Sequence, residues 1–202
     1  MSESYRTIPE PARAEFVVRG SEFVGRARPV DSVEDAEAFV DAVRAEYDDA
    51  THNVPAYRVR ADADGDLLRE YASDDGEPSG SAGKPALNVL AQRDVENCAV
   101  VVTRYYGGTN LGVGGLVRAY SRAAKEAIDS AGVVEERPHE RVSIVVEYDD
   151  SGTVRGILES EGYEFEADYE AEVSFDVRVP VAAAEALRDR LRSATSGRAT
   201  IE

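Results

Sequence analysis

The sequence predicts an α+β protein with two domains, residues 1–137 and residues 138–202. Segments with the two-residue alternation of strands are interspersed with segments in which apolar residues recur at helical spacing. From Val142 onward the predicted order is strand, helix, strand, strand, helix, strand, which is typical of a ferredoxin-like sandwich. A polar segment around Pro138 separates the two halves, and we interpret residues 135–140 as a linker.

Local signals in the first domain predict five strands and three helices. Ser32 is a suitable N-cap for a helix that extends to about Tyr47. The Asp64–Gly65 pair favours a tight turn within a hairpin, and Pro85 suits the first turn of a short helix. The expected strands are residues 12–19, 22–30, 56–62, 67–73 and 99–103, and the expected helices are residues 32–47, a short segment from Pro85, and residues 116–130.

The second domain is predicted to contain four strands and two helices. Gly162 is placed to end the first of these helices, because glycine is favoured just beyond a helix C-terminus. The expected elements are a strand at residues 142–148, a helix at 153–161, strands at 163–169 and 172–179, a helix at 181–193 and a strand at 198–201.

The composition indicates a soluble protein of a reducing compartment. Acidic residues outnumber basic ones by 40 to 23, and the net charge of −17 comes with only two lysines, Lys84 and Lys125. Salt screens self-repulsion, so an acidic, lysine-poor surface suits a salt-rich cytosol, and we expect a halophilic protein. Cys98 has no second cysteine with which to form an internal disulfide, and no apolar run approaches the ~20 residues of a membrane span. We therefore expect a cytoplasmic protein without a membrane partner.

One stretch of the chain departs from this acidic composition. No carboxylate occurs between Asn97 and Lys125, and residues 78–125 carry six basic and two acidic side chains. Burial of a core strand and a glycine loop is one explanation, because such segments offer few surface positions. The other is a surface kept free of carboxylates because it faces an anion such as phosphate or nucleic acid.

A Gly-rich loop and a basic helix face lie within this stretch. Glycine allows positive φ and close approach of the backbone to a ligand, and the helix that follows offers free N–H groups to an anion. Arg118, Arg122 and Lys125 recur at helical spacing and share one face, while Tyr105, Tyr106 and Tyr120 are candidate stacking surfaces. The alternative is a tight structural turn followed by a solvated helix face. The candidate ligand contacts here are Arg104, Tyr105, Gly107, Gly108, Gly112, Gly114, Gly115, Arg118, Arg122 and Lys125.

Three long motifs resemble a known family. THNVPAYRV (residues 51–59), DDGEPSGSAGKP (74–85) and RYYGGTNLGVGGLVRAY (104–120) look like the signature of the IMPACT family, in particular its YigZ-like, prokaryotic two-domain members. The resemblance implies a first domain similar to the second domain of a small-ribosomal-subunit protein, with a sheet covered by helices on one face. It implies a ferredoxin-like second domain similar to domain V of elongation factor G. Eukaryotic members regulate translation initiation, but they do so with an N-terminal partner-binding domain that this sequence lacks.

Two further features are candidates for chemistry. Asp74, Asp75 and Glu77 form a carboxylate cluster that is compatible with Mg²⁺, although capping of turns and pairing with Arg104 is the commoner role for such a cluster. His52 lies in a family-like motif and is a candidate acid, base or ligand contact. We include His52, Asp75 and Glu77 among the ligand-binding candidates and assign no catalytic residue, metal or cofactor.

These observations favour a non-catalytic protein that binds RNA or the ribosome and acts in translation, as a monomer, with a protein partner in translation also compatible. Two alternatives remain open. The first is a small-molecule enzyme that binds a phosphorylated ligand at the Gly-rich loop, for which no complete catalytic set can be assigned. The second is a protein-interaction module that acts through the sheet of either domain.

Overall fold

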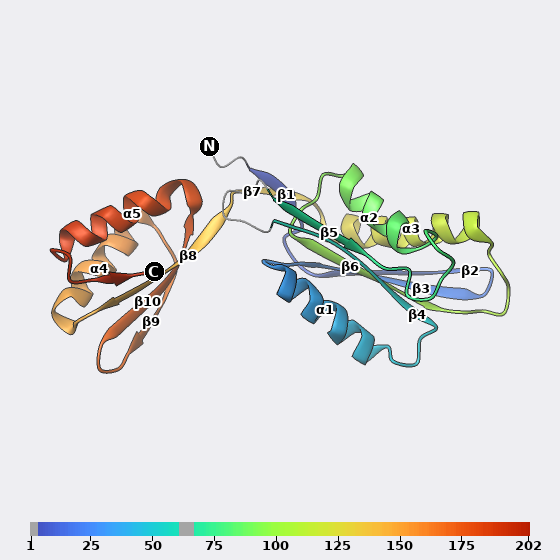
Figure 1. Cartoon of the computed structure of the whole chain (residues 1–202), viewed down its shortest axis with the longest axis horizontal. Coiled ribbons are helices and arrows are strands. Elements are labelled where there is room, and N and C mark those ends of the chain that lie inside the picture. Colours follow the sequence, from blue (N-terminus) through green and yellow to red (C-terminus); the bar gives the residue numbers. More distant parts are fainter. Residues whose placement is uncertain (1–3, 61–66) are drawn as a thin grey trace. The chain divides into compact units, whose positions relative to one another are not determined.

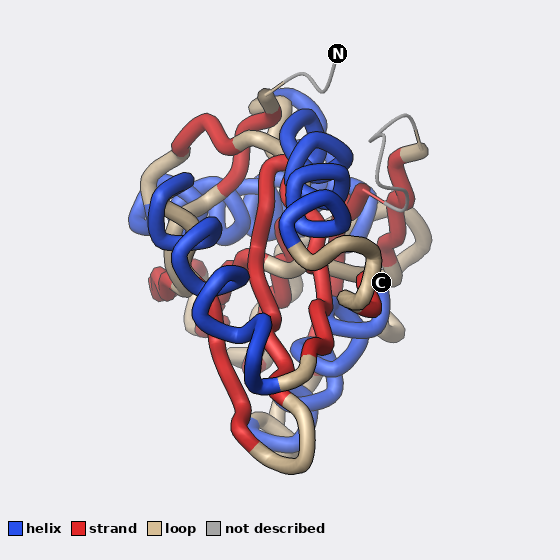
Figure 2. The backbone as a smooth tube through the Cα atoms, turned by 90° about the vertical axis from the view of Figure 1, so that its left-hand side faces the viewer, coloured by secondary structure: helices blue, strands red, loops and turns tan. Residues whose placement is uncertain are grey.

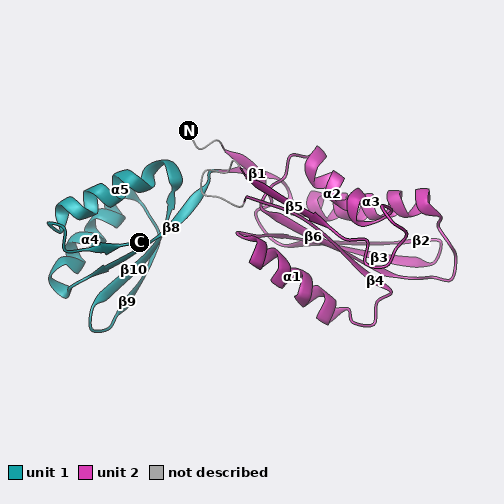
Figure 3. Cartoon of the chain, in the orientation of Figure 1, with its two compact units in different colours: residues 1–3, 137–202 teal, residues 4–136 magenta. Residues whose placement is uncertain are grey.

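The computed structural model describes residues 4–60 and 67–202. These residues divide into two compact units, 4–136 and 137–202, each of mixed α and β structure (Figure 3). The α+β prediction is confirmed. The tight turn expected at Asp64–Gly65 lies outside the described residues.

The first unit is built on a five-stranded antiparallel sheet with the order β2-β3-β6-β4-β5. The strands are β2 (Ala12–Val18), β3 (Ser21–Pro29), β4 (His52–Arg60), β5 (Leu68–Ala72) and β6 (Cys98–Tyr105). All five predicted strands are present. Strand β4 begins at His52, four residues before the predicted start, because the segment from His52 to Ala56 pairs with β6. His52 is therefore held by a sheet ladder and not by a loop.

Helices cover both faces of this sheet, which corrects the expectation of helices on one face. Helices α2 (Gly83–Gln92) and α3 (Val113–Ala131) lie on one face and α1 (Val33–Glu46) on the other (Figure 1). In β6, Val100 and Val102 pack in the core with α2 and α3, while Ala99 and Val101 pack with α1. Burial on both sides explains why this strand is a continuous apolar run without alternation.

Helix boundaries agree with the predicted caps in one case and differ in another. The Ser32 side chain accepts a hydrogen bond from the N–H of Asp35, as expected of an N-cap. Helix α3, however, begins at Val113, three residues before the predicted start. Gly114 and Gly115 consequently lie in the first turn of the helix, which corrects their assignment to the loop.

The predicted linker contains regular structure that the sequence analysis missed. Strand β7 (Val134–Glu136) pairs antiparallel with β1 (Tyr5–Thr7), and β8 already begins at His139. Each of the two paired strands has three residues, which is too short for alternation to be recognised.

The second unit has the predicted ferredoxin-like topology. Its antiparallel sheet has the order β11-β8-β10-β9, and α4 and α5 pack on one face through residues such as Leu158 and Leu191. Helix α4 begins at Tyr148, five residues earlier than predicted. The elements are β8 (His139–Val146), α4 (Tyr148–Glu161), β9 (Phe165–Tyr169), β10 (Val173–Pro180), α5 (Val181–Ala194) and β11 (Thr200–Ile201). Figure 2 shows the strands in red and the helices in blue.

Within residues 4–60 and 67–202, no helix is both long and apolar enough to cross a membrane.

Candidate functional site

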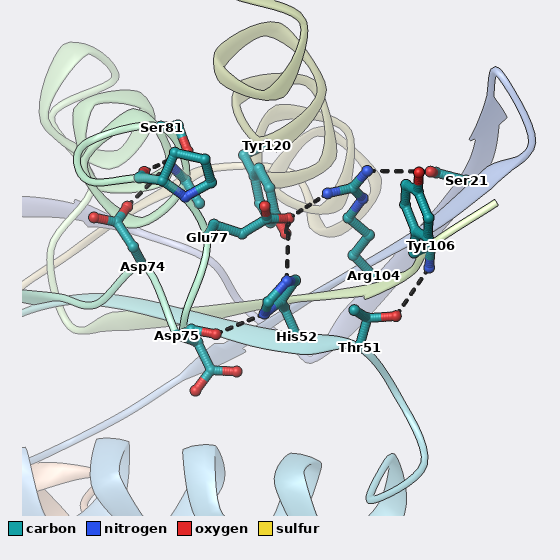
Figure 4. A network of polar contacts seen from close by, with 12 residues as sticks. Ser21, Thr51, His52, Asp74, Asp75, Glu77, Ser81, Arg104, Tyr106 and Tyr120 are labelled. Atoms are coloured by element: carbon teal, nitrogen blue, oxygen red, sulfur yellow. Dashed lines mark hydrogen bonds and ion pairs between the residues drawn. The ribbon is translucent and has the colours of Figure 1, made fainter. Parts of the chain in front are cut away.

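The polar centre of the first unit is the carboxylate of Glu77, which lies in the loop after β5. Its Oε1 accepts a hydrogen bond from Nη1 of Arg104, at 2.6 Å, and another from the hydroxyl of Tyr120, at 2.7 Å (Figure 4). Glu77 and Arg104 are both buried, and Tyr120 is fully buried. Burial and the hydrogen bond to Glu77 raise the pKa of the Tyr120 hydroxyl, which therefore remains a proton donor. Three elements, the loop, β6 and α3, are joined at this one oxygen atom.

His52, at the start of β4, faces this centre with a defined tautomer. Its Nδ1 lies 2.6 Å from the backbone oxygen of Asp75. A carbonyl oxygen only accepts hydrogen bonds, so Nδ1 carries the proton. In the neutral ring Nε2 then has a free lone pair. This atom faces Oε1 of Glu77 at 3.9 Å, which is too long for a hydrogen bond between them.

Arg104 is a structural cation as well as part of the lining of the site. In addition to Glu77, it contacts the hydroxyl of Ser21 through Nη2, at 3.3 Å. Its guanidinium group lies over the rings of Phe23 and Tyr106. The prediction that Arg104 pairs with the acidic loop is confirmed by its contact with Glu77.

The other two carboxylates of the acidic loop hold the loop itself in place. Asp74 accepts hydrogen bonds from the N–H groups of Gly80, Ala82 and Gly83, at 2.7, 3.0 and 2.9 Å. Burial acts to raise the pKa of Asp74, but these three donors outweigh it and the pKa lies below its usual value. Asp75 accepts from the N–H of Asn53 at 2.7 Å. The three carboxylates thus diverge, and within the described part of the chain no group of three His, Cys, Asp or Glu residues is arranged to hold a metal ion.

Of the three tyrosines considered as stacking surfaces, the structure presents only Tyr106 at the site. Tyr120 is fully buried. Tyr105 lies on the face of β6 that α1 covers, where its hydroxyl donates to Asp49 at 2.6 Å and this bond raises its pKa to about 12. Tyr106 is 46% exposed. Its hydroxyl donates to Oδ1 of Asn110 and its N–H donates to Oγ1 of Thr51, both at 3.0 Å.

Above Glu77 lies a pocket of about 430 Å³, which we call the Glu77 pocket. Its polar floor comes from the residues just described, its apolar walls come largely from the loop before α3, and its volume is in the range of small-ligand sites. The lining residues are Thr51, His52, Glu77, Pro78, Arg104, Tyr106, Asn110, Leu111, Gly112, Val113 and Leu116.

A second, smaller depression of about 230 Å³ lies beside the first turns of α3, and we call it the arginine hollow. Arg118 and Arg122 line it, and both are exposed, as is Lys125 farther along the helix. Arg19, in the turn between β2 and β3, also lines the hollow and was missed, because nothing in the sequence places that turn beside α3. The remaining lining residues are Val18, Leu111, Gly115 and Ala119.

The glycines of the loop have distinct structural roles. A Cβ at Gly107 would lie 1.9 Å from the carbonyl carbon of Gly20, so the loop packs directly on the β2–β3 turn. Gly108 and Gly112 have φ of +84° and +71°, a region that favours glycine. Gly114 has open space apart from the side chain of Arg118. The structural explanation therefore accounts for Gly107, Gly108 and Gly112 without a ligand.

Fold and site together define a two-domain α+β protein. One domain carries a buried Glu–Arg–Tyr network beneath a pocket, and the other is ferredoxin-like. Residues 19–128 match the Impact N-terminal domain, and residues 144–198 match a domain of unknown function, DUF1949. The chain belongs to the IMPACT family, as its motifs predicted.

The relatives extend over nearly the whole chain. The IMPACT family member YvyE of Bacillus subtilis is 34% identical over 100% of this chain and 92% of its own length. YigZ of Escherichia coli is 36% identical over 89% of this chain and 88% of its own. A solved structure described as a hypothetical protein is 33% identical, covers 100% of this chain and 97% of its own, and superimposes with a TM-score of 0.70.

Proposed function

We propose that this protein binds RNA through the arginine hollow and the adjoining Gly-rich loop, in a role connected with translation. One observation carries the proposal: three arginines from two separate elements line one depression, and no carboxylate is among the lining residues. In a chain with a net charge of −17, such a concentration of cationic groups favours an anionic partner.

The contacts of the three arginines leave donors available. Within the described residues, Arg19 and Arg118 form no ion pair, and Arg122 uses Nε for Glu126 at 2.7 Å. A guanidinium group presents five donors in a fork that matches phosphate oxygens. The N-cap of α3, Gly112, has no side chain to cap the helix, so the N–H groups of the first turn add a further anion-binding element.

The connection with translation is supported by the family, because its eukaryotic members regulate translation initiation. Contact with RNA or with the ribosome is the route that we propose, because the arginine hollow favours an anionic partner. A phosphorylated small molecule is the second candidate, which the Glu77 pocket favours by its volume and its position at the N-terminus of α3.

Fluorescence anisotropy with labelled single-stranded RNA at several salt concentrations tests the proposal. The variant Arg118→Gln/Arg122→Gln removes two charges without placing a new carboxylate near Glu126. We expect weaker binding and a log–log salt slope flatter by about 1.4, because each phosphate contact on a single strand contributes about 0.7.

The matched control is Arg190→Gln/Arg192→Gln on α5, which makes the same change in net charge at two half-exposed arginines of the other unit. It should bind RNA as the wild type does. Equal losses of RNA affinity in the two double variants would show that net charge alone determines binding. Saturable binding of a mononucleotide without binding of RNA would favour the second candidate.

A further inference from the structure

We propose that the Glu77 pocket receives an unpaired nucleobase that carries an exocyclic amino group. This inference rests on the proposed RNA binding and specifies which part of the RNA the neighbouring pocket binds. Leu111 lines both the Glu77 pocket and the arginine hollow, so the two depressions adjoin. A strand whose phosphates lie on the arginines therefore has a base within reach of the pocket.

The wall of the pocket offers a fixed aromatic surface. Tyr106 is 46% exposed, and hydrogen bonds from both its hydroxyl and its backbone N–H hold it in place. Bases stack on such rings without regard to sequence, because every base has a π-face. A ring that is already immobilised loses little conformational freedom when the base binds. Leu111 and Val113 complete an apolar enclosure suited to a flat heterocycle.

The floor of the pocket presents acceptors and thereby selects among bases. With Nδ1 of His52 protonated toward Asp75, Nε2 has a lone pair, whereas Oε1 of Glu77 already accepts hydrogen bonds from Arg104 and Tyr120. The 3.9 Å between Nε2 and Oε1 leaves these two acceptors without a shared proton. An exocyclic amino group can therefore donate one of its N–H groups to Nε2 of His52. A carbonyl oxygen at the same place would face the lone pair of Nε2 and be repelled.

Cytosine and uracil provide a test with two bases of nearly the same shape. Cytosine has an exocyclic amino group at the ring position where uracil has a carbonyl group. Anisotropy is measured with short labelled oligocytidine and oligouridine and the full-length protein. We expect about tenfold tighter binding of oligocytidine, which corresponds to ~1.4 kcal/mol. In His52→Asn the preference should fall to about twofold or less. The shorter amide keeps an N–H donor on the side of Nδ1 but lacks Nε2.

Stacking is tested by Tyr106→Leu, with Tyr105→Leu as a matched control at the preceding residue, whose side chain lies on the α1 side of the sheet. We expect Tyr106→Leu to weaken the binding of both oligonucleotides about tenfold. Tyr105→Leu should leave both affinities unchanged. Circular dichroism shows whether each variant is folded, and the exposed position of Tyr106 makes retention of the fold the expected result.

The outcomes separate this inference from the proposed function. Equal wild-type affinities for the two oligonucleotides, or undiminished binding by a folded Tyr106→Leu variant, would overturn the base pocket and leave the arginine hollow as the RNA site. If the wild type binds neither oligonucleotide, the proposed function and the base pocket both fail.

Discussion

Glu77 and Arg104 form an ion pair that is almost closed to solvent: 2.6 Å separates Oε1 from Nη1, and the two side chains retain 4% and 6% of their exposure. The pair joins the loop after β5 to the end of β6. Removal of one partner leaves the other charge buried and unpaired, which is far more costly than the loss of a surface pair. The pair therefore fixes the floor of the Glu77 pocket.

The first prediction concerns this pair. Arg104→Met should lower the free energy of unfolding of the first unit by about 3–5 kcal/mol, because Glu77 remains as an isolated buried charge. Urea denaturation followed by circular dichroism measures the change. Arg13→Met is the control, since Arg13 pairs with Glu15 at the surface and such pairs contribute about 0–1 kcal/mol. A loss below 1 kcal/mol for Arg104→Met would show that water reaches Glu77.

Much of the architecture was accessible from local patterns. The order of elements after Val142 predicted the ferredoxin-like sheet, because each element there has its own period or cap. The motif containing Asp74 and Glu77 also indicated an acidic loop that pairs with Arg104, and that contact is present. Local patterns specified the type of each element better than its ends, because β4, α3 and α4 each begin three to five residues before the predicted start.

Contacts between distant elements were less accessible. Arg104 and Tyr105 are consecutive in β6, yet Arg104 faces the Glu77 pocket and Tyr105 faces the α1 side, and this assignment depends on the register of β6. A shift of one residue would exchange the faces. Arg19 lines the arginine hollow because the β2–β3 turn packs on the loop through Gly20 and Gly107, which are 87 positions apart. The periodicity of apolar residues in the sequence does not indicate such a contact.

The second prediction concerns the dependence of stability on pH through Asp74. Its folded-state pKa is below the unfolded value of about 3.9, so its ionised form stabilises the fold. The contribution is fully present above the unfolded pKa and is lost as the pH falls through the folded pKa. We expect Asp74→Asn to be less stable than the wild type by roughly 1–3 kcal/mol at pH 7. That difference should shrink as the pH is lowered below about 4.

Thermal or urea unfolding at pH 7, 5, 4 and 3 measures this difference. Asp48→Asn is the control, because Asp48 is exposed and no side-chain contact to it occurs within the described residues. Its stability should follow that of the wild type at every pH. A difference between Asp74→Asn and the wild type that stays constant from pH 7 to pH 3 would contradict the role given to the three backbone donors.

The third prediction contrasts two glycines of the same motif. A Cβ at Gly107 would lie 1.9 and 2.0 Å from the carbonyl carbon and oxygen of Gly20, and backbone atoms cannot yield as a flexible side chain does. Gly107→Ala should therefore destabilise the first unit by more than 1 kcal/mol, through separation of the loop from the β2–β3 turn. At Gly114 the nearest atom is Nη1 of Arg118 at 3.5 Å, an ordinary contact.

Gly114→Ala should stabilise the protein by up to ~1 kcal/mol, because alanine in a helix loses less backbone entropy on folding than glycine. The two substitutions add the same methyl group seven residues apart and are expected to have opposite signs. Calorimetry of both variants measures the shift in melting temperature of the first unit. Destabilisation by Gly114→Ala would mean that the first turn of α3 is not helical in solution, and the loop would then extend to Leu116 as the sequence alone predicted.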